Sequence, residues 1–399
     1  MAQLGERCGI KHGMKSAALA WRGMLEGTIN PAKGESMTDQ ETPERAHVTA
    51  DDIEAANDLA AGIVYRKQIK SAASLRRLTG YADGYDLYAI DIAYDYDLDL
   101  IIAAGVRDDQ AYIDAVVAQV LPGVPAHVQA PQFACSAFVA VDAEGRVRTG
   151  RNYDFKDDTS ALLVRNHPRG GYASIGFAAL NNLGANTPLD SVTGRAAALM
   201  GPFAQLDGVN ECGVSIAVLT LDSKPCDQDT QRPVINTSLA IRLVLDRAAT
   251  TQEAVDLLSA HDMHAMAGRD YHFFINDAAG DARVVEWDPH DPDRAFKATP
   301  ARQVTNFYAC YGDEVLPNQK NGELGHGKER AVAIADVLDA HVGAQDETVA
   351  WKALRAAAQE PNPEDITSNT QWSVVFDNTE PAAAITLRRH WGDVDAFAL

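Results

Sequence analysis

The sequence has 399 residues, of which 46% are hydrophobic, and this length allows one large domain or two domains of ordinary size. Acidic residues outnumber basic ones by 56 to 35. The formal net charge of -21 argues against nucleic acids and anionic membrane surfaces as partners, so we expect a small-molecule substrate. No stretch approaches the roughly 18 consecutive apolar residues that a membrane-spanning helix needs.

Residues 1–48 are polar and irregular, which predicts a disordered leader or a true start at Met37. The apolar run at 14–25 is interrupted by Arg22 and lacks the long apolar core of a signal peptide, so we expect no export. Five cysteines are an odd number in a long chain without a secretory signal, which predicts reduced thiols in the cytoplasm. They are Cys8, Cys135, Cys212, Cys226 and Cys310.

Ordered structure is predicted from residue 49 onward. Residues 49–66 have helical spacing after a probable cap at Thr49, and 107–123 form a second predicted helix that ends at Pro122 and Gly123. Between them, residues 89–102 alternate apolar side chains with aspartates, which predicts a strand with one face in water. A calcium loop is a poor alternative there, because the required glycine and terminal glutamate are missing.

From Cys135 onward, the pattern is one of paired strands and then helices. Strands are predicted at 136–142, 146–154, 172–180, 203–207, 213–221, 271–277, 282–287, 372–378 and 383–389. Helices are predicted at 236–249, 251–261 and 328–341. Antiparallel connections of this kind predict an α+β fold in which helices are layered on antiparallel sheets.

The first hairpin places charged residues beside a cysteine. If "AEG" at 143–145 is its turn, Cys135 lies opposite Tyr153, with Arg151 and Asp154 next to the thiol. A cation favours the thiolate and a carboxylate can hold a protonated amine, so the arrangement suits a cysteine nucleophile. From the pattern alone, a buried structural cysteine beside a surface ion pair is an equally good interpretation.

Four stretches follow one another along the chain: "CSAFVAVDAEGRVRTGRNYDF", "LDGVNECGVSIAVLTL", "VTNF" and "GKERAVAIADVL". Together they resemble the choloylglycine hydrolase, or linear-amide C-N hydrolase, family of N-terminal-nucleophile enzymes. The family includes bile salt hydrolases and penicillin V acylases, with acid ceramidase and isopenicillin-N acyltransferase as more distant relatives. The resemblance covers about residues 133–390 and implies an αββα sandwich, in which antiparallel sheets lie between helical layers.

Carried over by position, the resemblance implies an active site of six residues without a metal or cofactor. Bile salt hydrolases have a second asparagine that stabilises the oxyanion, and this sequence has Thr220 at the matching position. The difference weakens the interpretation that the substrate is a bile salt, and it leaves a backbone N–H near Thr220 as the expected oxyanion donor. The implied nucleophile is Cys135, and the residues around it are Arg151, Asp154, Thr220, Asn306 and Arg330.

A cysteine at the start of a chain supplies nucleophile and base together, because its α-amine, with an unperturbed pKa of about 7.7 to 8, accepts the thiol proton. The resemblance implies that the precursor cuts its own Ala134–Cys135 bond. Residues 49–134 then form a pro-segment or α chain that stays docked, and 135–399 form the catalytic β chain. The partners expected are these two chains of one precursor, with a homo-oligomer as an alternative assembly.

The expected reaction is hydrolysis of a linear amide, with the acyl group passing through Cys135 to water. Alternatives are bile salt hydrolysis, acyl transfer to an amine as in isopenicillin-N acyltransferase, and a non-catalytic relative of the same fold. His261 and His264 have a spacing that could place both on one helix face, but zinc pairs more often lie four residues apart, so we expect no metal site. Phe307 and Tyr308 are candidate acyl-pocket residues, although core packing is the more frequent role of such aromatics.

Overall fold

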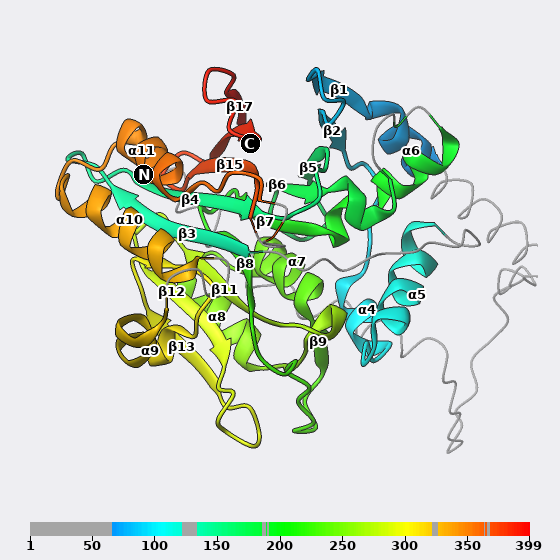
Figure 1. Cartoon of the computed structure of the whole chain (residues 1–399). Helices are drawn as coiled ribbons and strands as arrows, with labels where there is room; N and C mark the ends of the chain where they lie inside the picture. Colours follow the sequence, from blue (N-terminus) through cyan, green and yellow to red (C-terminus); the bar gives the residue numbers. More distant parts are fainter. Residues whose placement is uncertain are drawn as a thin grey trace, which may run out of the picture. The chain divides into compact units, whose positions relative to one another are not determined.

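Two β-sheets lie between helical layers in the part of the chain that the structure describes (Figure 1). The computed structural model describes residues 66–121, 134–185, 189, 191–320, 326–362, 364 and 368–399, and residues 66–399 form one structural unit. The leader predicted over 1–48 and nearly all of the helix predicted over 49–66 lie outside the described residues.

The larger sheet has nine strands, and all neighbours are antiparallel except β2 and β5, which are parallel. In spatial order its strands are β1 (Arg76–Thr79), β2 (Leu87–Asp91), β5 (Ala161–Asn166), β6 (Ser174–Ala179), β7 (Gln205–Asn210), β8 (Ser215–Leu221), β11 (Asp270–Asn276), β12 (Ala282–Trp287) and β13 (Phe296–Pro300). The segment before Cys135 therefore supplies the two strands at one end of this sheet, β1 and β2.

The smaller sheet has six antiparallel strands and carries the cysteine. In spatial order they are β14 (Gln303–Val304), β3 (Ala134–Val141), β4 (Val147–Asp154), β15 (Thr370–Asp377), β16 (Ala382–Leu387) and β17 (Asp395–Ala398). A separate parallel pair joins β9 (Val234–Asn236) to β10 (Asp262–His264).

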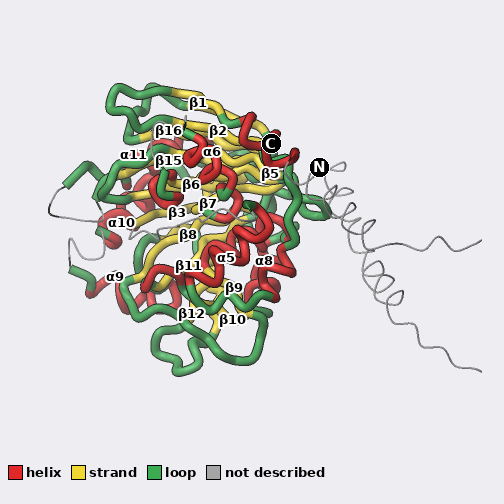
Figure 2. Tube along the Cα trace, turned by 90° about the vertical axis from the view of Figure 1, so that its right-hand side faces the viewer, coloured by secondary structure: helices red, strands yellow, loops and turns green. Residues whose placement is uncertain are grey.

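The helices in the described residues are α4 (Leu98–Ala103), α5 (Asp109–Val120), α6 (Val192–Leu199), α7 (Thr237–Arg247), α8 (Thr251–Ser259), α9 (Gly312–Asn318), α10 (Gly327–Asp339) and α11 (Glu347–Ala357). Four of them cover the outer faces of the two sheets. α10 and α11 pack on β3, β4 and β15, whereas α7 and α8 pack on the nine-stranded sheet. In Figure 2 the strands run through the middle, with α10 and α11 on one side and α8 on the other.

Apolar side chains fill both the sheet–sheet and the helix–sheet contacts. Phe177 of β6 and Phe376 of β15 meet between the sheets, with ring centroids 6.3 Å apart. Under α10 and α11, a second cluster gathers Phe138, Ile334 and Leu354. The predicted αββα sandwich is therefore confirmed. None of the helices in the described ranges is long and apolar enough to cross a membrane.

Most predicted elements from Cys135 onward are present, but the strand predicted over 89–102 is wrong. Strand β2 ends at Asp91, and α4 begins after Asp97, whose carboxylate accepts hydrogen bonds from the backbone N–H groups of Asp99 and Leu100. The buried residues of α4 are Leu98, Ile101 and Ile102. An N-cap aspartate followed by helical apolar spacing therefore prevails over the alternation of apolar residues with aspartates.

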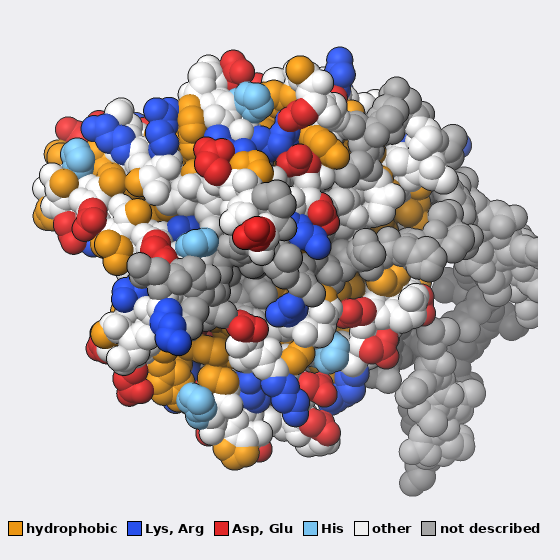
Figure 3. Space-filling view, in the orientation of Figure 1, with side chains coloured by type: hydrophobic (Ala, Val, Ile, Leu, Met, Phe, Trp, Pro, Cys, Tyr) orange, Lys and Arg blue, Asp and Glu red, His pale blue; other side chains and the backbone are white. Residues whose placement is uncertain are grey.

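Strand β5 and helix α11 were not predicted. The helix follows a short connection after α10, and its N-cap Asp346 accepts a hydrogen bond from the Val349 N–H. The helix predicted over 107–123 is confirmed as α5. On the face shown in Figure 3, the acidic and basic side chains of the described residues are interspersed.

Candidate active site

The β3–β4 hairpin has the predicted register, with Cys135 opposite Tyr153 and Ala134 opposite Asp154. Gly145 adopts a left-handed φ of 78° in the turn, a conformation that glycine takes without steric cost. Val147 to Asp154 are all buried, because the six-stranded sheet is covered on one face by α10 and α11 and on the other by the larger sheet. The hairpin thus carries its charged side chains into the core.

The Cys135 thiol is fully buried and lies against a guanidinium group. Arg151 Nη2 is 3.4 Å from Cys135 Sγ. Burial raises the pKa of the thiol to about 11, against lowering by Arg151, and the Asp154 charge raises it further. In the intact chain the thiol is therefore protonated at neutral pH.

Arg151 is held from its other side by a residue that the sequence did not reveal. Its Nε lies 2.9 Å from Asp207 Oδ2, and its Nη2 also donates to the Val218 carbonyl at 3.1 Å. Trp372 Nε1 donates to Asp207 at 3.1 Å. Burial raises the pKa of Asp207 to about 6, although Arg151 and Trp372 act to lower it. The one available signal was a single carboxylate within the buried strand β7.

Asn306 connects the cysteine to β8. Its Oδ1 accepts the Cys135 backbone N–H at 2.9 Å and Arg330 Nη2 at 2.6 Å. Its Nδ2 donates to the Thr220 carbonyl at 2.7 Å. The Thr220 hydroxyl oxygen is buried and makes no hydrogen bond among the described residues. A polar atom of this kind, left unpaired near the cysteine, is an available hydrogen-bonding group.

Arg330 and Asp154 complete the set of residues that the sequence indicated. Arg330, from α10, donates to the Cys135 carbonyl and lies 3.5 Å from Asp154 Oδ2. Asp154 also accepts from Thr370 Oγ1 at 2.6 Å and from Gln359 Nε2 at 3.1 Å. Burial raises the pKa of Asp154, against lowering by Arg330, Thr370 and Gln359. No local motif marks Thr370 or Gln359.

All six residues indicated by the sequence are thus buried and linked by hydrogen bonds or ion pairs. The histidines are placed elsewhere: His261 follows the end of α8 and His264 lies in β10, so the two do not share a helix face. His272 Nδ1 lies 3.3 Å from Glu286 Oε2 inside the protein. The described residues contain no cluster of three or more histidine, cysteine or acidic side chains arranged for a metal.

The aromatics beside Asn306 and the remaining cysteines have other contacts. The Tyr308 hydroxyl forms hydrogen bonds with Ser223, at 2.6 Å, and with Asp270. The Phe307 side chain is buried. Among the described residues, Cys135, Cys226 and Cys310 carry free thiols, as expected.

Comparisons with known proteins support this fold. A family model described as acyl-coenzyme A:6-aminopenicillanic acid acyl-transferase matches residues 141–390, which include every residue of the site except Cys135. Two variants of conjugated bile acid hydrolase from Clostridium perfringens have similar structures, each with 14% identity, a TM-score of 0.51, and 66% of this chain and 92% of that chain covered. Penicillin V acylase from Agrobacterium tumefaciens has 20% identity, a TM-score of 0.49, and coverage of 66% and 86%. A search of curated proteins finds no match.

Proposed function

The chain belongs to the acyl-coenzyme A:6-aminopenicillanic acid acyl-transferase family and has an N-terminal-nucleophile hydrolase fold like that of the choloylglycine hydrolases, and from this premise we propose that it is a self-cleaving precursor of a cysteine amidohydrolase. The observation that carries the proposal is that two side chains contact the buried residue Cys135. Arg151 contacts the Cys135 thiol, while Asn306 accepts the hydrogen bond of its backbone nitrogen.

The proposed self-cleavage begins with attack of Cys135 Sγ on the Ala134 carbonyl carbon. The C–N bond then breaks, the nitrogen takes up a proton and becomes the α-amine, and the acyl group remains on sulfur as a thioester. Water hydrolyses the thioester and frees the thiol. The nitrogen that becomes the amine already contacts Asn306 Oδ1 in the intact chain.

In the proposed catalytic cycle, the amine takes the thiol proton and Sγ attacks the carbonyl carbon of a linear amide. Arg151 favours the thiolate, and the amine returns the proton to the departing amine product. The Asn306 amide and a donor at Thr220, either its hydroxyl or a nearby backbone N–H, stabilise the oxyanion after local rearrangement. Asp154 and Arg330 supply the charged groups around the amine. Water then hydrolyses the thioester and releases the acyl group.

Mass spectrometry of the purified protein tests the cleavage. We expect a fragment that begins with Cys135, and we expect Cys135→Ala to leave one uncut chain. A wild-type chain that stays full length and still hydrolyses amides contradicts the α-amine mechanism. A hydrolysis screen of penicillin V, conjugated bile salts, N-acyl homoserine lactones and N-acylethanolamines then defines the acyl and amine groups that the site accepts.

Chemical blocking of the amine tests which group is the base. Reductive methylation of the new N-terminus under conditions that spare thiols should abolish turnover. His261→Ala, His264→Ala and His272→Ala should each retain most of it, because the ring nitrogens of these histidines bond to Leu257, Asp227 and Glu286 rather than to Cys135. A dead histidine variant together with a working blocked enzyme points instead to a cysteine–histidine pair.

A second candidate is transfer of the acyl group from the thioester to an amine, and the family description favours it. Both reactions share the first half, in which Cys135 is acylated. An added amine acceptor distinguishes them, because a transferase yields the N-acyl product in preference to the free acid. The cytoplasmic location expected from the cysteine count stays a prediction, as do the two-chain assembly and the homo-oligomer.

A further inference from the structure

A tight turn at the end of β16 has arginine at both positions that demand a left-handed backbone. Arg388 has φ 40° and Arg389 has φ 64°, and the His390 N–H closes the turn on the Leu387 carbonyl at 2.9 Å. Turns with a positive φ at both central residues strongly prefer asparagine and glycine, because other side chains clash with the backbone there. Contacts of the two arginine side chains must therefore hold the turn in place.

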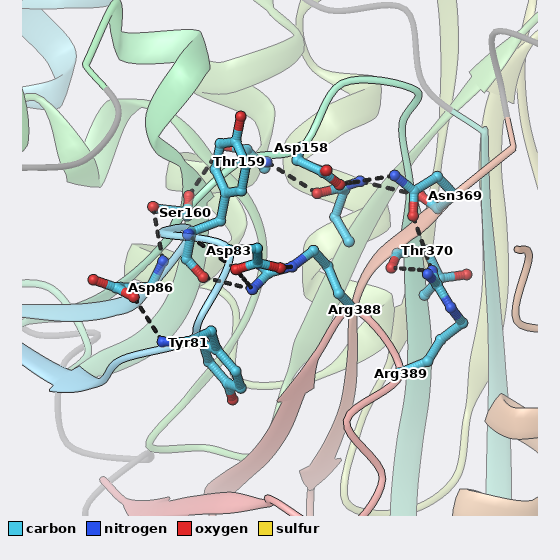
Figure 4. A network of polar contacts seen from close by, with 12 residues as sticks. Tyr81, Asp83, Asp86, Asp158, Thr159, Ser160, Asn369, Thr370, Arg388 and Arg389 are labelled. Atoms are coloured by element: carbon cyan, nitrogen blue, oxygen red, sulfur yellow. Dashed lines mark hydrogen bonds and ion pairs between the residues drawn. The ribbon is translucent and has the colours of Figure 1, made fainter. Parts of the chain in front are cut away.

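Arg388 is held by the segment that precedes Cys135. Its guanidinium makes two bonds of 2.8 Å to the Asp83 carboxylate and one of 2.6 Å to the Tyr85 carbonyl. It also lies over the rings of Tyr81 and Tyr85, 5.1 and 5.6 Å from their centroids. Figure 4 shows Asp83 and Arg388 pointing toward each other. This loop of the N-terminal segment thus surrounds a side chain from the end of the chain.

Arg389 points the other way, toward the residues that hold Asp154. Its Nη1 donates to the carbonyls of Gln359 and Thr370, at 3.1 and 3.0 Å, and to Asn369 Oδ1 at 2.9 Å (Figure 4). The side chains of Gln359 and Thr370 are the two uncharged donors to the Asp154 carboxylate. Arg389 therefore fixes the backbone from which Asp154 is oriented.

We propose that docking of residues 76–91 on the Arg388–Arg389 turn positions the Asp154 carboxylate, so that the N-terminal segment is a working part of the active site after cleavage. The order of contacts is Asp83 to Arg388, then through the turn to Arg389, and from there to Gln359 and Thr370. In this arrangement Asp83, Arg388 and Arg389 are positioning residues. The inference rests on the role of Asp154 given under the proposed function.

Hydrogen exchange in the uncut Cys135→Ala chain tests the relay without any activity. The Thr370 N–H donates to the Gln359 carbonyl at 2.9 Å, and the Gln359 N–H donates to Thr370 Oγ1 at 2.7 Å. We expect Asp83→Asn to speed exchange of these two amides by about tenfold, because local opening becomes easier. Thr79→Val is the matched control, since it removes a 2.7 Å bond from the same segment to Asp395, away from Asp154.

A double-mutant cycle decides whether Asp83 acts through Arg389. Arg389→Gly keeps the left-handed backbone but removes the three hydrogen bonds of the side chain and its ion pair with Glu360. Since Asp83 and Arg389 share no contact, a relay predicts that Asp83→Asn has almost no further effect on exchange at Gln359 and Thr370 in the Arg389→Gly chain. Independent, additive effects overturn the proposal, as does an Asp83→Asn chain whose exchange at these amides matches Thr79→Val.

Kinetics of the processed enzyme, with penicillin V as the substrate, give a second test. Asp83→Asn and Arg389→Gly should each lower kcat by roughly fivefold to tenfold and leave KM nearly unchanged, because a misplaced group reduces turnover more than it weakens ground-state binding. A loss confined to KM counts against the relay. If wild-type protein neither self-cleaves nor hydrolyses any amide, the proposed function fails, while the exchange cycle still decides the relay.

Discussion

At the scale of single residues, the site is organised around a buried guanidinium that serves two partners. Arg151 contacts the Cys135 thiol at 3.4 Å and the Asp207 carboxylate at 2.9 Å. Asp207 balances the charge of Arg151 and fixes the direction in which its remaining N–H groups point. Without a carboxylate there, Arg151 is a buried charge with no ionised partner on that side.

Asp207→Asn should therefore lower both stability and turnover. Leaving one partner of a buried ion pair uncompensated costs about 3–5 kcal/mol in free energy of unfolding. We expect turnover to fall by about tenfold or more, since Arg151 is then free to shift away from the thiol. Chemical denaturation and steady-state kinetics measure the two effects. Glu253→Gln, at a surface helix cap, is the control, and equal values for both variants contradict the role given to Asp207.

The pH dependence of the proposed self-cleavage follows from the buried thiol. Its pKa is raised to about 11, so below that pH the thiolate fraction grows about tenfold with each pH unit. If thiolate attack limits the step, the cleavage rate should rise in the same proportion between pH 6 and 9. Precursor made by cell-free synthesis and followed on denaturing gels gives the rate. Arg151→Gln should slow cleavage at every pH, because Arg151 lowers the thiol pKa, and a pH-independent rate contradicts attack by the thiolate.

At the scale of elements, what the sequence predicted well is what short-range patterns determine. The "AEG" turn set the β3–β4 register, so Arg151 and Asp154 were placed beside Cys135 from spacing alone. The prediction at 89–102 was wrong because the sequence around Asp97 fits two patterns: a helix N-cap, and a strand in which aspartates alternate with apolar residues. Thr370 donates a hydrogen bond to Asp154 although the two residues are 216 positions apart in the sequence, and no short-range pattern indicates such a contact.

Cross-strand packing in the β3–β4 hairpin gives a prediction for stability. Phe138 lies opposite Gly150, and a Cβ added to Gly150 would lie 2.3 Å from the Phe138 ring. Gly150→Ala should lower the free energy of unfolding by about 1–3 kcal/mol through overpacking. Phe138→Leu in the same chain should restore part of the loss, and Gly392→Ala, with no atom within 4 Å of its new Cβ, is the control. Denaturant titration in the Cys135→Ala background measures this, and a neutral Gly150→Ala contradicts the packing.

At the scale of the whole unit, residues 66–121 are built into the sandwich. Strand β2 pairs with β5, the Tyr94 hydroxyl donates to the Leu199 carbonyl, and the Tyr112 hydroxyl donates to the Phe203 carbonyl. Cutting the Ala134–Cys135 bond breaks none of these contacts. Removing the segment would leave β5 as an open sheet edge, which favours aggregation.

The two fragments that the proposed cleavage yields should therefore stay together. Size-exclusion chromatography in plain buffer should give a single peak that contains both, and the smaller fragment should separate only at denaturant concentrations that unfold the sheet. Its separate elution from folded protein in buffer contradicts the docked arrangement.

The pairing of β4 with β15 also sets a time before which the proposed self-cleavage cannot take place. Thr370 reaches Asp154 only after a further 216 residues have been synthesised, and Asn306 and Arg330 also follow Cys135 by long stretches of chain. At about 5–20 residues per second, that interval is on the order of 10 to 40 s. A nascent chain released by a stop codon before β15 should stay uncut, so the proposed cut reports that β15 has been synthesised and has paired with β4.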